Sequence, residues 1–136
     1  MKKYVSIAIM MAVIFSTTSL AANKTKALKA SQQAVESLMM GLESENYGLK
    51  LSSAYMLGEL SSKKAVFSLM RMLRTANNED ERIVAALALY KIGDPAGLNI
   101  VKKAISFDES GRVRKHCSDF YHQYVLNLKG KEAKSY

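Results

Sequence analysis

Residues 35–42 read VESLMMGL, and residues 66–73 read VFSLMRML. Val, Ser, Leu, Met and Leu recur at matching positions of the two segments. A looser third copy runs from Leu98 to Ile105. In sequence, Leu98 lies nearly as far after Val66 as Val66 lies after Val35. Self-similarity at a period of this length is typical of stacked helical repeats. Such arrays bind partners along an extended surface, so the pattern favours an interaction protein over an enzyme.

The spacing of apolar residues within and around these segments is helical. Residues 35, 38, 39 and 42 follow the 0, 3, 4, 7 spacing of a chain that turns every ~3.6 residues. Asp94 and Pro95 suit a helix start, because Asp caps the first turn and proline lacks an N–H that would be unpaired there. Gly93 suits the end of the preceding helix, and Ser61 or Ser62 would cap the third helix. The sequence predicts six helices, at about residues 25–42, 47–60, 62–73, 79–92, 95–105 and 112–128.

The six predicted helices form three consecutive pairs. In the second helix of each pair, the same types of residue recur at a constant spacing along the sequence. Small residues recur at this step at Ala54, Ala86 and Ser118, where they would let neighbouring helices approach closely. Large residues beside them would fill the grooves: Leu57, Leu89 and Tyr121, then Leu60, Ile92 and Tyr124. No single pair covers its own apolar face, and roughly three stacked repeats are needed for stability. We therefore predict an all-α fold, a short right-handed α-solenoid of about three helical hairpins.

Three runs of sequence resemble a known family: AYMLGEL at residues 54–60, AALALYKIGD at residues 85–94, and Val113-Arg114 behind Asp108-Glu109. They are similar to HEAT repeats, and most similar to the short bacterial type named for phycobilisome lyases. The resemblance covers about residues 27–128. It implies a binding scaffold or, as in some relatives, a subunit or chaperone of an enzyme.

The resemblance also assigns charged positions. The family's basic residue at the start of each second helix maps onto Arg82 and Arg114, with Lys50 in the first repeat. The acid just before it maps onto Asp80 and Asp108, with Glu45 as a rough counterpart. The third repeat departs from the pattern and fits a terminal unit with a wet outer face. Its divergent residues are Lys115, Ser118, Tyr121 and Tyr124.

The N-terminal residues have the layout of a secretory signal peptide. Two lysines precede an apolar run from Tyr4 to Phe15, and small residues at Ser19 and Ala21 suit a signal peptidase. The run is too short to cross ~30 Å of hydrocarbon, which takes ~20 residues, so we favour cleavage over a membrane anchor. No Cys lies at its end, which disfavours a lipoprotein.

We therefore expect three segments and an exported product. Residues 1–21 are the signal peptide, residues 22–128 the HEAT-like helical repeat domain, and residues 129–136 a basic C-terminal tail. The expected location is periplasmic or secreted. The whole chain carries a net charge of +8, and loss of a leader with two lysines and no acid leaves +6.

Lysines gather at both ends of the expected mature chain, at residues 24, 26 and 29 and at residues 129, 131 and 134. Basic ends favour acidic proteins, anionic lipid surfaces or nucleic acid, and they also serve solubility alone. Because an exported chain rarely meets nucleic acid, we expect a protein partner, with an acidic surface as one option. We expect no nucleic acid and no stable membrane insertion after signal cleavage.

The absence of catalytic motifs predicts a non-enzymatic protein. There is no glycine-rich phosphate loop, no paired Cys motif and no HExxH sequence. His116, Asp119 and His122 are the one set to test as metal ligands, but steps of three spread them over roughly 120° of a helix. We therefore expect no metal and no cofactor. Cys117 shares an apolar helical face with Tyr121 and Tyr124, which predicts a buried, inert thiol.

Lys50, Arg82 and Arg114 are the candidate partner-binding residues. One interpretation is a basic strip along the concave surface that meets an acidic partner. The other is a ladder, in which each cation pairs with an acid such as Glu45, Asp80 or Asp108 and sets the register between repeats. The aromatic residues of the last helix are open in the same way, as core or as an exposed docking end.

Together these features predict an exported, non-enzymatic HEAT-repeat module or adaptor for protein–protein interaction. One alternative is an accessory subunit or chaperone of an enzyme, which predicts a cleft for an apolar or tetrapyrrole-like ligand. The other is a nucleic-acid-binding helical array, which predicts a continuous basic groove and strongly salt-dependent binding.

Overall fold

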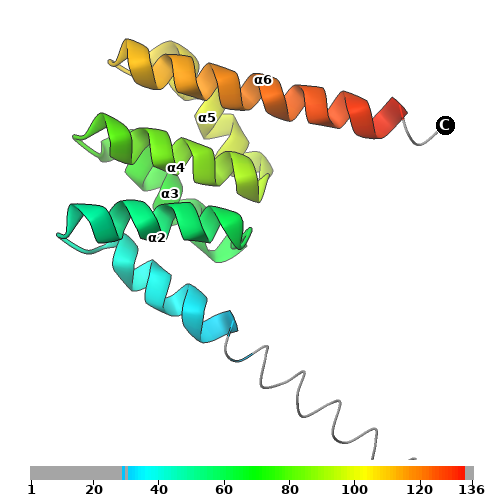
Figure 1. Ribbon diagram of the computed structural model, residues 1–136. Helices are drawn as coiled ribbons and strands as arrows, with labels where there is room; N and C mark the ends of the chain where they lie inside the picture. The colour runs from blue at the N-terminus through cyan, green and yellow to red at the C-terminus, as the bar shows by residue number, and fades with distance from the viewer. Residues whose placement is uncertain (1–28, 30, 134–136) are drawn as a thin grey trace, which may run out of the picture. The chain divides into compact units, whose positions relative to one another are not determined.

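The computed structural model describes residues 29 and 31–133 (Figure 1). The predicted signal peptide, residues 1–21, and the start of the first predicted helix lie outside the described residues. The chain divides into two compact units, residues 1–36 and 37–136. In the first unit, residues 31–36 are helical.

The second unit contains the other helices that the structure describes. Residues 37–42 are helical, and they are followed by α2 (Tyr47–Glu59), a 3-10 turn η1 (Lys63–Ala65), α3 (Val66–Thr75), α4 (Glu79–Ile92), α5 (Pro95–Phe107) and α6 (Gly111–Ala133). Over the described residues every regular element is helical, so the predicted all-α class is confirmed. None of the helices described is both long enough and apolar enough to cross a lipid bilayer.

Polar side chains set the starts of three helices. Asn46, Asn78 and Asp94 each accept a hydrogen bond from a backbone N–H of the first turn that follows. Such caps satisfy donors that a helix start otherwise leaves unpaired. Helix α4 has the predicted bounds, and it ends at Gly93, whose φ of 70° is the left-handed conformation that glycine adopts without strain.

The predicted hydroxyl cap before the third helix is wrong. The side chain of Ser62 accepts no capping hydrogen bond, and its backbone carbonyl accepts from Ala65 N instead, at 3.0 Å. This i to i+3 bond makes a turn of 3-10 helix, which leads directly into α3 at Val66.

The last two helices are longer than predicted. Helix α5 continues past Ile105 to Phe107, and α6 continues past Leu128 to Ala133, into the segment expected to be a tail. Just before this extension, the side-chain amide of Asn127 donates to the Tyr90 hydroxyl of α4 at 3.3 Å. Lys131 lies in the last turn, where a cation interacts favourably with the helix dipole.

The hairpins stack in chain order within the second unit. Helices α2, α4 and α6 lie side by side in one layer, while α3 and α5 form a second layer behind them (Figure 1). Helix α3 packs against α4, and α5 packs against α6. The side chains with no exposed surface lie between the layers; the largest are Leu57, Leu69, Leu89, Val101, Val113 and Cys117. The predicted stacking of hairpins is confirmed.

Helices α2 and α4 approach each other closely at a glycine. A Cβ atom added to Gly58 would lie 2.8 Å from the Cα of Ala88, so the two backbones pack directly against each other. Of the small residues predicted to lie at helix–helix contacts, Ala54 and Ala86 are fully buried, whereas Ser118 is exposed. In the last repeat, Val113 and Cys117 are the buried residues of α6 instead.

We expect Gly58→Ala to destabilise the protein despite alanine's better helix propensity. The added methyl group would press on backbone, and overpacking of this kind costs ~1–3 kcal/mol. Alanine's propensity offsets at most about 1 kcal/mol of that. Urea unfolding followed by circular dichroism would measure the change. Gly130→Ala is the matched control, because nothing lies within 4 Å of its added Cβ; equal stability of the two variants would contradict the close packing.

Candidate interaction surface

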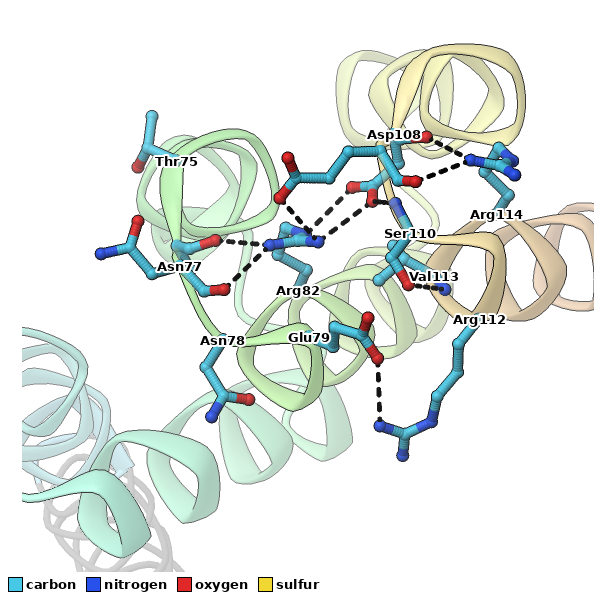
Figure 2. Close-up of polar contacts among 12 residues, drawn as sticks. Thr75, Asn77, Asn78, Glu79, Arg82, Asp108, Ser110, Arg112, Val113 and Arg114 are labelled. Carbon is cyan, nitrogen blue, oxygen red and sulfur yellow. Dashed lines mark hydrogen bonds and ion pairs between the residues drawn. The ribbon is translucent and has the colours of Figure 1, made fainter.

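Arg82 lies in the first turn of α4 and is buried, with 5% of its side chain exposed. Its Nη1 donates to the carbonyl oxygens of Ala76 and Asn77, at 2.8 and 3.2 Å (Figure 2). These carbonyls follow the end of α3, where backbone acceptors have no partner within the helix. Arg82 therefore ties the start of one helix to the end of the helix before it.

The same guanidinium reaches into the next repeat. Its Nη2 donates to Asp108 Oδ1 at 3.1 Å, and its Nε lies 3.0 Å from Asp108 Oδ2 as an ion pair, with an N–H direction unsuited to a hydrogen bond. Only 9% of the Asp108 side chain is exposed. The exposed carboxylate of Glu109 lies 3.5 Å from Nη2. Two-point pairing of this kind fixes orientation as well as distance.

Arg114 repeats part of this arrangement one hairpin later. Its Nη1 donates to the carbonyl oxygens of Asp108 and Glu109, at 2.7 and 3.0 Å. In both arginines the acceptors lie six and five residues back in the chain. Lys50, at the equivalent position of the first hairpin, has no forked side chain, and its Nζ lies 3.6 Å from Glu81 Oε1 in the next second helix.

These contacts place Lys50 and Arg82 between repeats, whereas the contacts of Arg114 stay within the loop of its own hairpin. The Arg82–Asp108 pair is the one expected for a ladder. Asp80 instead pairs with Arg112, at 2.7 Å, and accepts a hydrogen bond from the Tyr47 hydroxyl, at 3.0 Å. Arg82 offers a partner little surface because it is buried. Partner binding by Lys50, Arg82 and Arg114 stays a prediction.

Two ion pairs absent from the sequence-based interpretation join neighbouring repeats. Glu59 pairs with Lys91, and Asp80 pairs with Arg112. Hydrogen bonding by Lys91, with a smaller contribution from Tyr55, lowers the pKa of the Glu59 carboxyl. Tyr47 and then Arg112 lower the pKa of Asp80 in the same way. Opposite charges at equivalent positions of successive repeats are the signal that would have found both pairs.

Aromatic side chains line the layer of second helices. Tyr90 stacks on Phe120 with ring centroids 6.0 Å apart, and the ring of His116 lies at the same centroid distance from Phe120. Lys91 Nζ lies 4.9 Å from the centre of the Tyr55 ring, a cation–π distance. The sequence left open whether the aromatic residues of α6 are core or exposed. Phe120, Tyr121 and Tyr124 are half-buried.

A hollow of about 710 Å³ lies where α2, α4 and α6 approach their C-terminal ends. We call it the C-terminal hollow. All three second helices contribute to its lining, so one bound segment would contact every repeat. The lining residues are Gly58, Glu59, Ser61, Tyr90, Lys91, Ile92, Gly93, Tyr124, Asn127, Leu128 and Lys131.

Two residues of the candidate metal set, Asp119 and His116, make other contacts. Asp119 Oδ2 lies 3.7 Å from Lys115 Nζ, and the ring of His116 lies against Phe120. In the part of the chain that the structure describes, no three His, Cys, Asp or Glu side chains come together as metal ligands. Asp119 and His116 therefore make ordinary helix-surface contacts.

Cys117 is fully buried in α6, as the sequence predicts. Burial, with a smaller contribution from the Asp108 carboxylate, raises the pKa of its thiol to about 12. The thiolate, the reactive form, is therefore scarce near neutral pH. This position is an inert packing residue.

We expect Cys117 to make folding sensitive to high pH. The unfolded thiol ionises near pH 9 and the native thiol near pH 12, so the native state binds the extra proton between these values. Stability from this group is complete below pH 9 and is lost as pH rises towards 12. The stability advantage of the native protein over Cys117→Ala should therefore shrink across this window in urea titrations. An advantage that is constant from neutral pH to the top of the window would contradict the burial of the thiol.

Comparison with known sequences adds one match. A sequence profile of HEAT repeats matches residues 35–118. The matched region contains α2 to α5 and the first third of α6, together with Lys50, Arg82 and Arg114. No curated protein matches the chain significantly.

Proposed function

Because the chain belongs to the HEAT-repeat family, we propose that it is an exported, non-enzymatic protein-interaction module whose C-terminal hollow receives a protein partner. HEAT repeats are helical arrays that bind partners along their surfaces. The observation that carries the proposal is the convergence of α2, α4 and α6 on one hollow of about 710 Å³.

The lining of the hollow suits a polypeptide. Tyr90, Tyr124 and Leu128 supply rings and an aliphatic group for an apolar anchor, and tyrosine is among the residues that dominate binding energy at interfaces. Asn127 and Lys131 supply polar groups beside them. Lys91 is already paired with Glu59, so Lys131 is the cation left to meet an acidic group of the partner.

The three candidate cations take separate roles in this proposal. Lys50 and Arg114 retain partly exposed side chains and remain candidates for direct contact with an acidic partner. Arg82 contributes indirectly, because its buried contacts hold α4 in register with the loops on either side. The proposed order of importance for binding is therefore the hollow first and the cation strip second.

Site-specific photo-crosslinking tests the surface. A benzophenone amino acid replaces Leu128, in the hollow, or Ser118, an exposed position elsewhere on α6. Irradiation of intact cells should give a discrete, higher-mass protein adduct from position 128 and none from position 118. A lack of adduct at 128, or the same adduct at both positions, would argue against the hollow as the protein-binding site.

Export is tested separately. After osmotic shock, the protein should be in the periplasmic fraction, with an intact mass that corresponds to a chain beginning at Ala22. Full-length protein in the cytosol would refute export. If the crosslinked partner is an enzyme whose activity depends on this protein, the accessory-subunit alternative replaces the general adaptor.

A further inference from the structure

A strongly basic face covers the layer formed by η1, α3 and α5. We call it the outer face. Segments 63–75 and 95–107, which form it, contain no Asp or Glu. They carry six exposed cations: Lys63, Lys64, Arg71, Arg74, Lys102 and Lys103. By contrast, α4 in the other layer has three acids in its first turn.

Most of these cations have no ion-pair partner among the residues that the structure describes. Arg71 pairs with Glu43, and Lys102 Nζ lies 5.6 Å from the centre of the Tyr121 ring. Lys63, Lys64, Arg74 and Lys103 form no ion pair with any residue in the described ranges. Asp108, at the end of α5, is already paired with Arg82.

Two phenylalanines protrude from the same face. Phe67 of α3 is 79% exposed and Phe107 of α5 is 85% exposed. Lys64, Phe67, Arg71 and Arg74 follow helical spacing of three or four residues, so they form one stripe. Phe107, Arg74 and Lys103 line a hollow of about 390 Å³ between α3 and α5. The third phenylalanine that the structure describes, Phe120, stacks on Tyr90 instead.

We propose that the outer face binds peripherally to an anionic phospholipid surface. Cations near such a surface are attracted to the lipid phosphates, and their aliphatic stems tolerate the apolar boundary below. Aromatic rings at this depth insert between headgroups and acyl chains. Phe67 and Phe107 are the two insertion points, and the cations flank each of them. This contact is surface adsorption, which needs no membrane-spanning helix.

The composition of the face favours lipid over protein. Four of its six cations are lysines, and lysine is depleted at the cores of protein interfaces. The cations lie on η1, α3 and α5, and two of them, Arg74 and Lys103, line one hollow with Phe107, where a phosphate layer would contact both. A nucleic acid or an acidic protein is the competing anionic partner, and the experiment below separates these outcomes.

Vesicle binding tests the charge. We expect the protein to co-sediment with vesicles of phosphatidylglycerol and phosphatidylcholine but not with phosphatidylcholine alone, and to be released by high salt. Lys64→Gln/Arg74→Gln/Lys103→Gln should lower partitioning roughly a hundredfold, since each basic residue at an anionic surface is worth roughly fivefold. Lys115→Gln/Lys129→Gln/Lys131→Gln removes the same charge from α6 and should stay within a fewfold of the native protein. Equal losses in the two triple variants would overturn the proposal.

Fluorescence tests the insertion points. The chain contains no tryptophan, so Phe67→Trp and Phe107→Trp each introduce a single reporter. Both should shift their emission to the blue when anionic vesicles are added, whereas Leu126→Trp, on exposed α6, should not. All variants share the same N-terminal segment, so membrane binding by that segment alone would give no difference among the three.

Two results would overturn the lipid assignment. One is no emission shift at positions 67 and 107, or the same shift at position 126. The other is face-dependent binding to polyglutamate or single-stranded DNA without any to vesicles, which would assign the face to an acidic polypeptide or a nucleic acid. Circular dichroism of each variant should match that of the native protein, because every substituted residue is exposed.

Discussion

Leu89→Asp should leave the protein unfolded at room temperature. Leu89 has no exposed surface and lies on α4 between the two layers. The substitution removes a buried leucine, which costs ~2–5 kcal/mol in the alanine case, and adds an unpaired charge whose burial costs several kcal/mol more. Domains are stable by only ~5–15 kcal/mol, so the sum approaches or exceeds the whole stability.

Matched variants separate burial from the chemical change itself. Leu126→Asp makes the same substitution on α6 at a side chain that is 46% exposed, and it should change stability by no more than about 0.5 kcal/mol. Leu57→Asp, one repeat earlier and equally buried, should behave like Leu89→Asp. Far-ultraviolet circular dichroism and thermal melting measure all three. Native helicity and melting in both buried variants would show that the core is wrongly assigned.

Arg82→Ala should destabilise the protein by ~3–5 kcal/mol, the cost of removing one partner of a buried ion pair. Asp108 would keep a nearly buried carboxylate with no cation against it, and the carbonyls of Ala76 and Asn77 would lose their donor. Arg82→Lys should recover little of this loss, because an ammonium group cannot bridge the carbonyls and the carboxylate at the same time.

Two arginine controls locate the source of that loss. Arg114→Ala removes two carbonyl contacts but strands no carboxylate, so about 1–3 kcal/mol is expected. Arg71→Ala breaks an exposed pair with Glu43 and should cost at most about 1 kcal/mol. In Arg82→Ala/Asp108→Ala the stranded charge is gone, so this double variant should be more stable than Arg82→Ala. A double variant that is less stable would mean that the pair is not coupled as its geometry requires.

The same contrast between local and distant causes explains which elements were predictable. The bounds of α4 follow from neighbours in sequence, because Asn78 caps one end and Gly93 turns left-handed at the other. In α6, by contrast, Asn127 contacts Tyr90, which lies in a different repeat and which no local pattern identifies. Ser62 stands at the start of the 3-10 turn, but only its backbone carbonyl, not its side chain, accepts a hydrogen bond there.

The candidate site was also predictable only in part. The constant step between repeats placed Lys50, Arg82 and Arg114 at equivalent positions, but the reach of each side chain decided its contacts. No sequence pattern marks Gly58, because glycine adds no side chain to an apolar pattern, although its missing Cβ lets α2 approach α4 closely. The exposure of Phe67 and Phe107 depends on how far α3 and α5 cover each other, which no local pattern reports.

By itself, the sequence determined that this protein is a stack of helical hairpins, because apolar spacing, caps and a regular recurrence of residue types can all be read along the chain. Only the tertiary structure decided which side chains of those helices are buried, paired or exposed. Arg82 is buried in contacts between repeats, and Phe67 is exposed on the surface. Each result depends on neighbours that are brought close by packing and not by their order in the chain.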